Sequence, residues 1–256
     1  MLPDASAQNL KETIKRIKPS IVGIGTYRST ERPPAVLLGT GFVVGDGNHV
    51  LTNSHVYSSC LDNAKERGEK GERADDERAA EYVVVFFRSG DSTPYRHAKK
   101  VGEDKVHDVA LLEFTGDRVP AMSLGDDNHV EEGQAIAFTG FPIGAVLGLH
   151  PVTHRGIISA ITPIAQPMIT ARLLDPVMIA QLEHPFDVFQ LDATAYPGNS
   201  GSPLYDPETG VVYGILSSVF VKESKEKILE NPSGITYAIP VRHARELLEQ
   251  VAKPGS

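Results

Sequence analysis

The sequence predicts an all-β protein, either a barrel or a sandwich, and three observations lead to this prediction. Ten short apolar runs follow one another between residues 21 and 240. Gly, Pro, Asn or Asp separates most of these runs, and many short strands at close spacing are typical of barrels and sandwiches. The chain has 256 residues, 41% hydrophobic and 23% charged, which suits two small globular lobes or one large β unit.

The first elements can be justified in chain order. A short helix is expected over residues 8–18, because Leu10, Ile14 and Ile17 recur at helical spacing before Pro19 stops the pattern. Apolar runs then follow, and we expect each to be a strand: IVGIGTY, AVLLGTGFVVG, HVLTNSHV, EYVVVFFR, VALLEF, AIAFTGF, RGIISAI, FQLDAT, VVYGILSSVF and ITYAIP.

Three segments differ from this strand pattern. Residues 61–81 are almost wholly charged and small, which predicts a solvated loop or a frayed helix. Residues 165–184 have an apolar, partly helical pattern and are expected to form a surface insertion: a helical excursion, a lid or a face for a partner. Residues 241–251 predict an amphipathic closing helix with Leu247 and Leu248 facing inward.

Charge and hydropathy exclude several classes of function. The chain has 25 Lys and Arg against 33 Asp and Glu, a net charge of −8, and no basic run dense enough to follow a phosphate backbone. Nucleic acid is therefore not an expected partner. The longest stretch without charged side chains, residues 133–154, is broken by Gly and Pro, so no membrane insertion is expected. The first ten residues lack a cationic segment followed by an apolar one, so no signal peptide is expected.

The cysteine and histidine content argues against a metal site. One cysteine, Cys60, excludes an intrachain disulfide framework and a thiolate-rich site. We expect Cys60 to be a small buried hydrophobic residue. The nine histidines form no HExxH pattern and have no Cys/His pairing, so neither a catalytic metal nor another cofactor is expected.

The most informative stretch is AYPGNSGSPL, which places Ser200 between Gly198, Asn199 and Gly201. Glycines on both sides let the backbone take tight conformations that expose one hydroxyl and direct successive N–H groups toward one point. A serine nucleophile beside an oxyanion hole has this arrangement. Taken alone, the stretch fits a Gly-Ser turn between two strands equally well.

A serine hydroxyl needs a base to become a nucleophile, and the chain offers both partners. His55 lies at the end of the strand-like run HVLTNSHV, and Asp108 directly precedes the run VALLEF. Each alone is commonly a surface or turn residue. The order His, Asp, Ser, with gaps of 108−55=53 and 200−108=92 residues, is a known chain order of the catalytic triad.

These motifs resemble those of chymotrypsin-fold serine proteases of the HtrA (Deg) type. The likeness extends along most of the chain, through IKPSIVGI, GTGFVVGDGNHVLTNSHV, HDVALLEF, MSLGDDNHVEEGQAIAFTGFPIG, VTHRGIISAI, FQLDATAYPGNSGSPLYD and GITYAIPV. The resemblance implies two six-stranded antiparallel β-barrels. It divides the chain into a helical segment 1–20, a first barrel 21–117, a second barrel 118–240 and a closing helix 241–256.

The resemblance also implies a role for each site residue. His55 is then the general base, Asp108 orients it, and Ser200 attacks the scissile carbonyl, while backbone N–H groups of Gly198 and Ser200 form the oxyanion hole. The implied activity is that of a serine endopeptidase acting on unfolded protein or peptide substrates at an extracytoplasmic site. The alternative is a latent or chaperone-like binding module on the same fold.

The substrate pocket follows from position. In this fold its base lies six residues before the nucleophile, which gives Thr194, flanked by Ala195, and the wall strand 215–218 supplies Leu216. A pocket with these residues is neutral and moderately apolar, and it predicts cleavage after Val, Ala or Leu. Asp192 would change this prediction only if its strand ran straight to the pocket.

Several features depart from the family pattern. Ser54 stands where the family usually has Ala, and Ser202 stands where a second Gly is usual. The insertion 165–184 is longer than the family's sensor loop, and no C-terminal PDZ domain is expected. The first 26 residues have no aromatic side chain, so the family's trimer contacts are not expected and the oligomeric state stays open.

Overall fold

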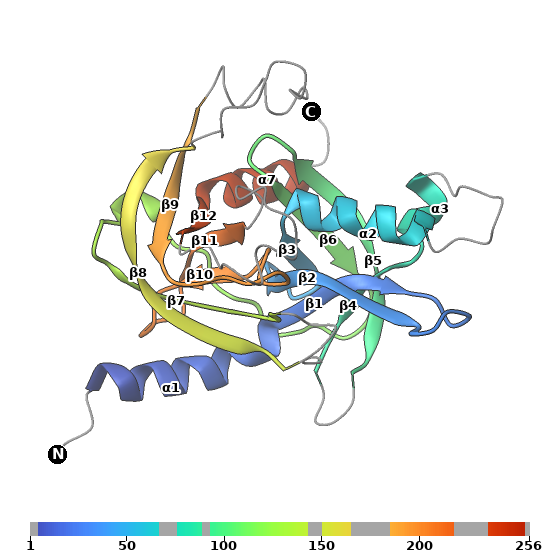
Figure 1. Cartoon of the computed structure of the whole chain (residues 1–256), viewed down its shortest axis with the longest axis horizontal. Coiled ribbons are helices and arrows are strands. Elements are labelled where there is room, and N and C mark those ends of the chain that lie inside the picture. Colours follow the sequence, from blue (N-terminus) through green and yellow to red (C-terminus); the bar gives the residue numbers. More distant parts are fainter. Residues whose placement is uncertain are drawn as a thin grey trace.

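The computed structural model describes residues 5–66, 76–88, 93–142, 150–164, 185–217 and 235–253. Its strands form two closed antiparallel barrels of six strands each, which lie side by side in Figure 1. The predicted fold class is therefore confirmed.

The first barrel has the strand order β1-β2-β3-β6-β5-β4. Its strands are β1 (Ile21–Tyr27), β2 (Ala35–Val44), β3 (His49–Thr52), β4 (Val83–Phe86), β5 (Tyr95–Asp104) and β6 (Val109–Phe114). Branched aliphatic and aromatic side chains fill its interior, among them Val22, Ile24, Val43, Val50, Leu112 and Phe114. Cys60 is buried in the same cluster, as predicted, and burial raises the pKa of its thiol.

The second barrel has the strand order β10-β11-β12-β9-β8-β7. Its strands are β7 (Ala135–Gly140), β8 (Val152–Pro163), β9 (Asp187–Asp192), β10 (Pro203–Tyr205), β11 (Val212–Ser217) and β12 (Ile235–Pro240). A separate apolar cluster fills its interior. A third cluster contains residues of both barrels, such as Phe42, Leu51, Ile215 and Ile239, so apolar packing holds the two barrels together.

Both terminal helices are present near the expected positions. Helix α1 (Ala5–Ile17) and the short η1 (Lys18–Ser20) precede the first barrel, and α7 (Arg242–Ala252) follows the second. Figure 1 shows α7 beside the two barrels, next to the strands of the first. It packs there because Gly102, at a bulge in β5, has no side chain; a Cβ at Gly102 would lie 2.9 Å from Val251 and 3.0 Å from Leu247. No helix of the described chain is long and apolar enough to span a bilayer.

One expectation about the segment after β3 is wrong. The run HVLTNSHV is a strand only to Thr52, and His55 lies in the first turn of helix α2 (Ser54–Glu66). Residues 61–81 were predicted as a solvated loop or a frayed helix, and the described part is helical in α2 and in α3 (Asp76–Ala80), in line with the second alternative. Ala64 and Ala79 are buried there, because small residues let these helices pack closely. Residues 67–75 and the predicted insertion 165–184 lie outside the described residues.

Candidate active site

His55 and Asp108 are joined by two hydrogen bonds. The His55 backbone N–H donates to Asp108 Oδ1 at 2.9 Å, and His55 Nδ1 lies 2.8 Å from Asp108 Oδ2. The start of α2 supplies His55, and the turn between β5 and β6 supplies Asp108. One carboxylate thus fixes both the backbone and the ring of the histidine, which leaves Nε2 as the ring atom available for proton transfer.

Asp108 is held from several directions. Its φ of 54° is the only positive value for a non-glycine residue within the described part of the chain. Its carbonyl accepts hydrogen bonds from Asn53 Nδ2 at 3.0 Å and from the Ser54 N–H at 3.2 Å. Ser217, at the end of β11 in the second barrel, donates its hydroxyl to Asp108 Oδ2 at 3.0 Å. The strained backbone is therefore stabilised by contacts from both barrels.

The neighbouring carboxylate, Asp104, does not contact His55. It accepts hydrogen bonds from the backbone N–H of His107 at 3.0 Å and pairs with Nδ1 of that ring at 2.6 Å. Burial alone would raise the pKa of Asp104, but the hydrogen bonds from His107 outweigh burial, so the pKa lies below its usual value.

Ser200 lies in a tight turn between β9 and β10. The Asn199 N–H donates to the Tyr196 carbonyl at 3.0 Å, and Gly198, the third residue of this turn, has a φ of 98°. With Pro197 second and Gly third, these values are typical of a type II turn. Gly201 also needs to be glycine, because its φ is 85° and a Cβ there would lie 1.9 Å from the Thr40 carbonyl oxygen.

Thr40, in β2 of the first barrel, holds this turn from the opposite side. Its N–H donates to the Ser200 carbonyl at 2.8 Å, and its hydroxyl donates to the Gly198 carbonyl at 2.7 Å. The same hydroxyl accepts from the Phe141 N–H at 3.0 Å, at the end of β7. The turn that bears Ser200 is therefore fixed across the barrel interface.

Both departures from the family pattern are accommodated. The buried Ser54 hydroxyl donates to Glu103 Oε1 at 2.6 Å, and Glu103 forms an ion pair with Lys100. Ser202 is buried where Gly140 leaves space, since a Cβ on Gly140 would lie only 2.0 Å from the Ser202 hydroxyl. Neither serine displaces a group of the candidate site.

The two-barrel fold, the paired histidine and aspartate and the serine turn agree with the comparison to protein families. The family model described as "Trypsin-like peptidase domain" matches residues 39–215, which is more than half of the chain. The chain belongs to this family.

Curated relatives of this trypsin-like peptidase are named DegP-like serine endoproteases, which agrees with the HtrA (Deg) type that the sequence predicts. A probable periplasmic serine endoprotease DegP-like from Halomonas elongata is 31% identical over 223 residues, which is 86% of this chain and 36% of the relative. A DegP-like relative from Pseudomonas putida F1 is 30% identical over 232 residues, 89% of this chain and 38% of the relative. The chain thus spans less than two fifths of the length of either relative.

Solved structures show the same fold. HtrA-type protease AlgW with tripeptide has a TM-score of 0.60 at 24% identity and covers 94% of this chain and 63% of its own. HtrA-type protease AlgW with decapeptide has a TM-score of 0.62 at 22% identity, covering 95% and 67%.

The predicted pocket residues of this trypsin-like peptidase come from two segments of the second barrel, the stretch after β9 and strand β11. Thr194 and Ala195 follow β9 and are half-buried, and the Ala195 N–H donates to Thr236 Oγ1 in β12 at 3.1 Å. Leu216 is buried in β11. Asp192, at the end of β9, is exposed to solvent. Residue 218 of the predicted wall lies outside the described residues.

Sequence reasoning missed two residues that join the barrels at the site. Ser217 was expected only as part of the pocket wall 215–218, yet its hydroxyl donates a hydrogen bond to Asp108. Thr40 was not singled out, although it lies in the run GTGF next to two glycines that allow close approach. A hydroxyl residue between glycines in a predicted strand was the available signal.

Proposed function

We propose that this chain is a serine endopeptidase that cleaves unfolded protein substrates through an acyl-enzyme. The observation that carries the proposal is the double hydrogen bond between His55 and one Asp108 carboxylate, reinforced by Ser217 from the other barrel. An aspartate held in this way fixes the tautomer of the histidine and stabilises the imidazolium that forms during proton transfer.

In the proposed reaction, each residue of the site has a defined role. Ser200 Oγ attacks the scissile carbonyl carbon while His55 Nε2 takes the hydroxyl proton. The tetrahedral intermediate collapses as the same proton passes to the leaving amine, and water, activated by His55, then releases the acyl group. Backbone N–H groups of Gly198 and Ser200 stabilise the oxyanion; removing one donor of such a hole costs about 10²- to 10³-fold in kcat.

The geometry favours a ready enzyme over the latent module. A type II turn with Gly198 at φ 98° has the opposite peptide orientation to a type I turn, and Pro197 is suited to the second position of either. The two hydrogen bonds from Thr40 support the observed form. We therefore infer that the Gly198 N–H faces the oxyanion without an activating partner.

For specificity, we propose a small aliphatic residue before the cleaved bond. Thr194, Ala195 and Leu216 provide no charge, and the exposed Asp192 gives no support for pairing with Arg or Lys. Each methylene that fits badly costs about 1–3 kcal/mol. A peptide-library digest should show cleavage mainly after Val, Ala or Leu, whereas cleavage mainly after Arg or Lys would implicate Asp192.

We also propose an extracytoplasmic location, because the relatives are named periplasmic endoproteases.

Hydrolysis of unfolded casein tests the proposal. The parent should degrade casein, and Ser200→Ala should abolish this while circular dichroism and melting temperature stay unchanged. Ser58→Ala is a matched control, because Ser58 is an exposed serine of α2 outside the Ser200 turn and should leave the rate unaltered. Cleavage by Ser200→Ala at the parent rate would refute the assignment of the nucleophile.

A further inference from the structure

A cluster of aromatic rings lies directly beside the candidate site. The rings of His107 and His243 are stacked, with centroids 3.7 Å apart and planes 11° apart. Phe186, just before β9, packs edge-on against both, at 4.6 Å from His107 and 5.4 Å from His243. This cluster joins three segments: the β5–β6 turn, the start of β9 and helix α7.

His107 belongs to the turn that presents Asp108. Its N–H and Nδ1 are both bound by the Asp104 carboxylate, at 3.0 and 2.6 Å, and the Asp108 N–H donates to the Lys105 carbonyl at 3.4 Å. The turn must hold Asp108 at a φ of 54°, a conformation that costs free energy in a non-glycine residue. The contacts of the adjacent His107 therefore act on the same turn as those that hold Asp108 directly.

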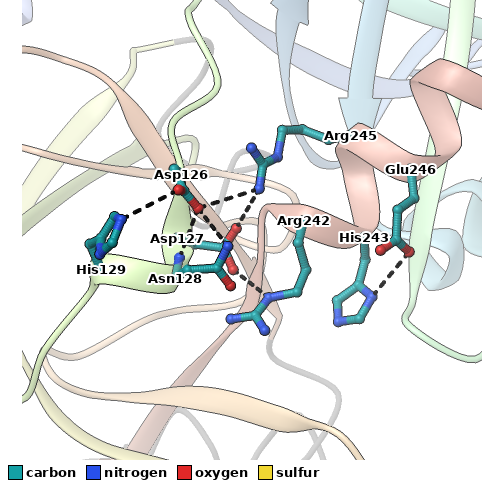
Figure 2. A network of polar contacts seen from close by, with 8 residues as sticks. All are labelled: Asp126, Asp127, Asn128, His129, Arg242, His243, Arg245 and Glu246. Atoms are coloured by element: carbon teal, nitrogen blue, oxygen red, sulfur yellow. Dashed lines mark hydrogen bonds and ion pairs between the residues drawn. The ribbon is translucent and has the colours of Figure 1, made fainter.

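The partner ring of His107 is itself held rigidly. His243 projects from the first turn of α7, and the flanking arginines of that helix bind a carboxylate on the second-barrel side (Figure 2). Arg242 Nε lies 2.6 Å from Asp127 Oδ2 and Arg245 Nη2 lies 3.3 Å from Asp127 Oδ1, and the Asp127 side chain is 0% exposed. Charge-assisted hydrogen bonds to a buried carboxylate fix the start of α7. The His243 ring is therefore held in place where it stacks on His107.

We propose that His107 is a positioning residue for Asp108, held between the Asp104 carboxylate and the His243 ring. This inference rests on the proposed function, because it assigns to His107 the task of keeping Asp108 in register with His55. His107 touches neither substrate nor His55 in this scheme. A displaced turn lengthens the His55–Asp108 hydrogen bonds and misaligns the base, and a misplacement of about 1 Å costs about 10²-fold in rate.

Two variants separate the hydrogen bond from the ring contact. His107→Phe keeps an aromatic ring against His243 and loses the bond to Asp104, whereas His107→Asn keeps a side-chain amide that can bind Asp104. We expect kcat to fall about 10- to 100-fold in His107→Phe with KM within about twofold, and to recover within about threefold of the parent in His107→Asn. His129→Ala is the matched control, because the His129 side chain is 85% exposed.

A proton NMR spectrum provides a readout that does not depend on activity. The far-downfield resonance of the proton between His55 Nδ1 and Asp108 should be sharp in the parent, broadened or lost in His107→Phe and restored in His107→Asn. If His107→Phe does not fold, His243→Ala removes the stacked ring without changing the sequence of the turn. It should then lower kcat and broaden the resonance, as expected for His107→Phe.

The outcomes distinguish this inference from the proposed function. An unchanged kcat and an unchanged resonance in His107→Phe, or in His243→Ala if that variant is used, would overturn the positioning role. If the parent itself hydrolyses no peptide, the proposed function fails, and the resonance still decides whether His107 positions Asp108.

Discussion

Protonation of His243 should make the protein less stable in acid. The pKa of His243 is lowered to about 4, first by burial and then by the neighbouring His107 and Arg242, which together outweigh the carboxylate of Asp104. Glu246, at 4.0 Å, is the other charged group facing the ring. In the unfolded chain an imidazole has a pKa of about 6.5, so the unfolded state binds the proton first as the pH falls.

The sign and size of the stability change follow from the difference between the folded and unfolded pKa values of His243. Between pH 6.5 and 4 the unfolded state holds more protons, so the free energy of unfolding decreases as the pH falls. A difference of about 2.5 units corresponds to at most about 3 kcal/mol. Water at the open edge of the cluster, where the His107 side chain is 24% exposed, screens part of this, and we expect about 2 kcal/mol.

Urea unfolding of the parent and of His243→Phe at pH 7.5 and pH 4.5 measures this contribution. Phe keeps a ring in the stack and cannot bind a proton, so the loss of stability between the two pH values should be smaller in the variant by about 2 kcal/mol. His129→Gln, at an exposed histidine, should behave like the parent. Equal pH dependence in the parent and His243→Phe would refute the reasoning.

Three further predictions concern the site. Asp108→Asn should lower kcat about 10⁴-fold near neutral pH through the wrong histidine tautomer, and a loss below about tenfold in peptide hydrolysis would point to another carboxylate. Ser217→Ala should lower kcat about tenfold without unfolding, since Asp108 keeps its bonds to His55; a rate equal to the parent would show that the contact across the barrels is dispensable. Thr40→Val should reduce kcat and the affinity for a peptide boronic acid together, about tenfold each, whereas Thr40→Ser should restore both; loss in neither assay would separate Thr40 from the oxyanion turn.

The sequence predicted the barrels because most strands have apolar, turn-bounded runs, and it missed those that lack this signal. Strand β5 (Tyr95–Asp104) has six charged or histidine residues among its ten, and a bulge after Lys100 interrupts its register. Strand β10 has only three residues. Strand β5 pairs with β4 and β6, and β10 pairs with β11 and with the distant β7. These pairings support strands that the local apolar pattern does not reveal.

The site shows the same division between local and long-range information. The serine turn and the His, Asp, Ser order are visible in the sequence, and the hydrogen bonds between His55 and Asp108 agree with that order. The prediction that His55 lies on a strand was wrong, because the strand ends at Thr52 and α2 begins at Ser54. The contacts of Thr40 and Ser217 cross between the barrels, so only the folded chain brings them to the site.

Covalent labelling tests the central claim most directly. The protein should be treated with a fluorophosphonate probe, digested, and analysed by mass spectrometry for the residue that carries the adduct. The account predicts one adduct, on Ser200, that is absent in Ser200→Ala and forms far more slowly in His55→Ala. A folded protein that takes up no label, or an adduct on another residue that persists in Ser200→Ala, would contradict it.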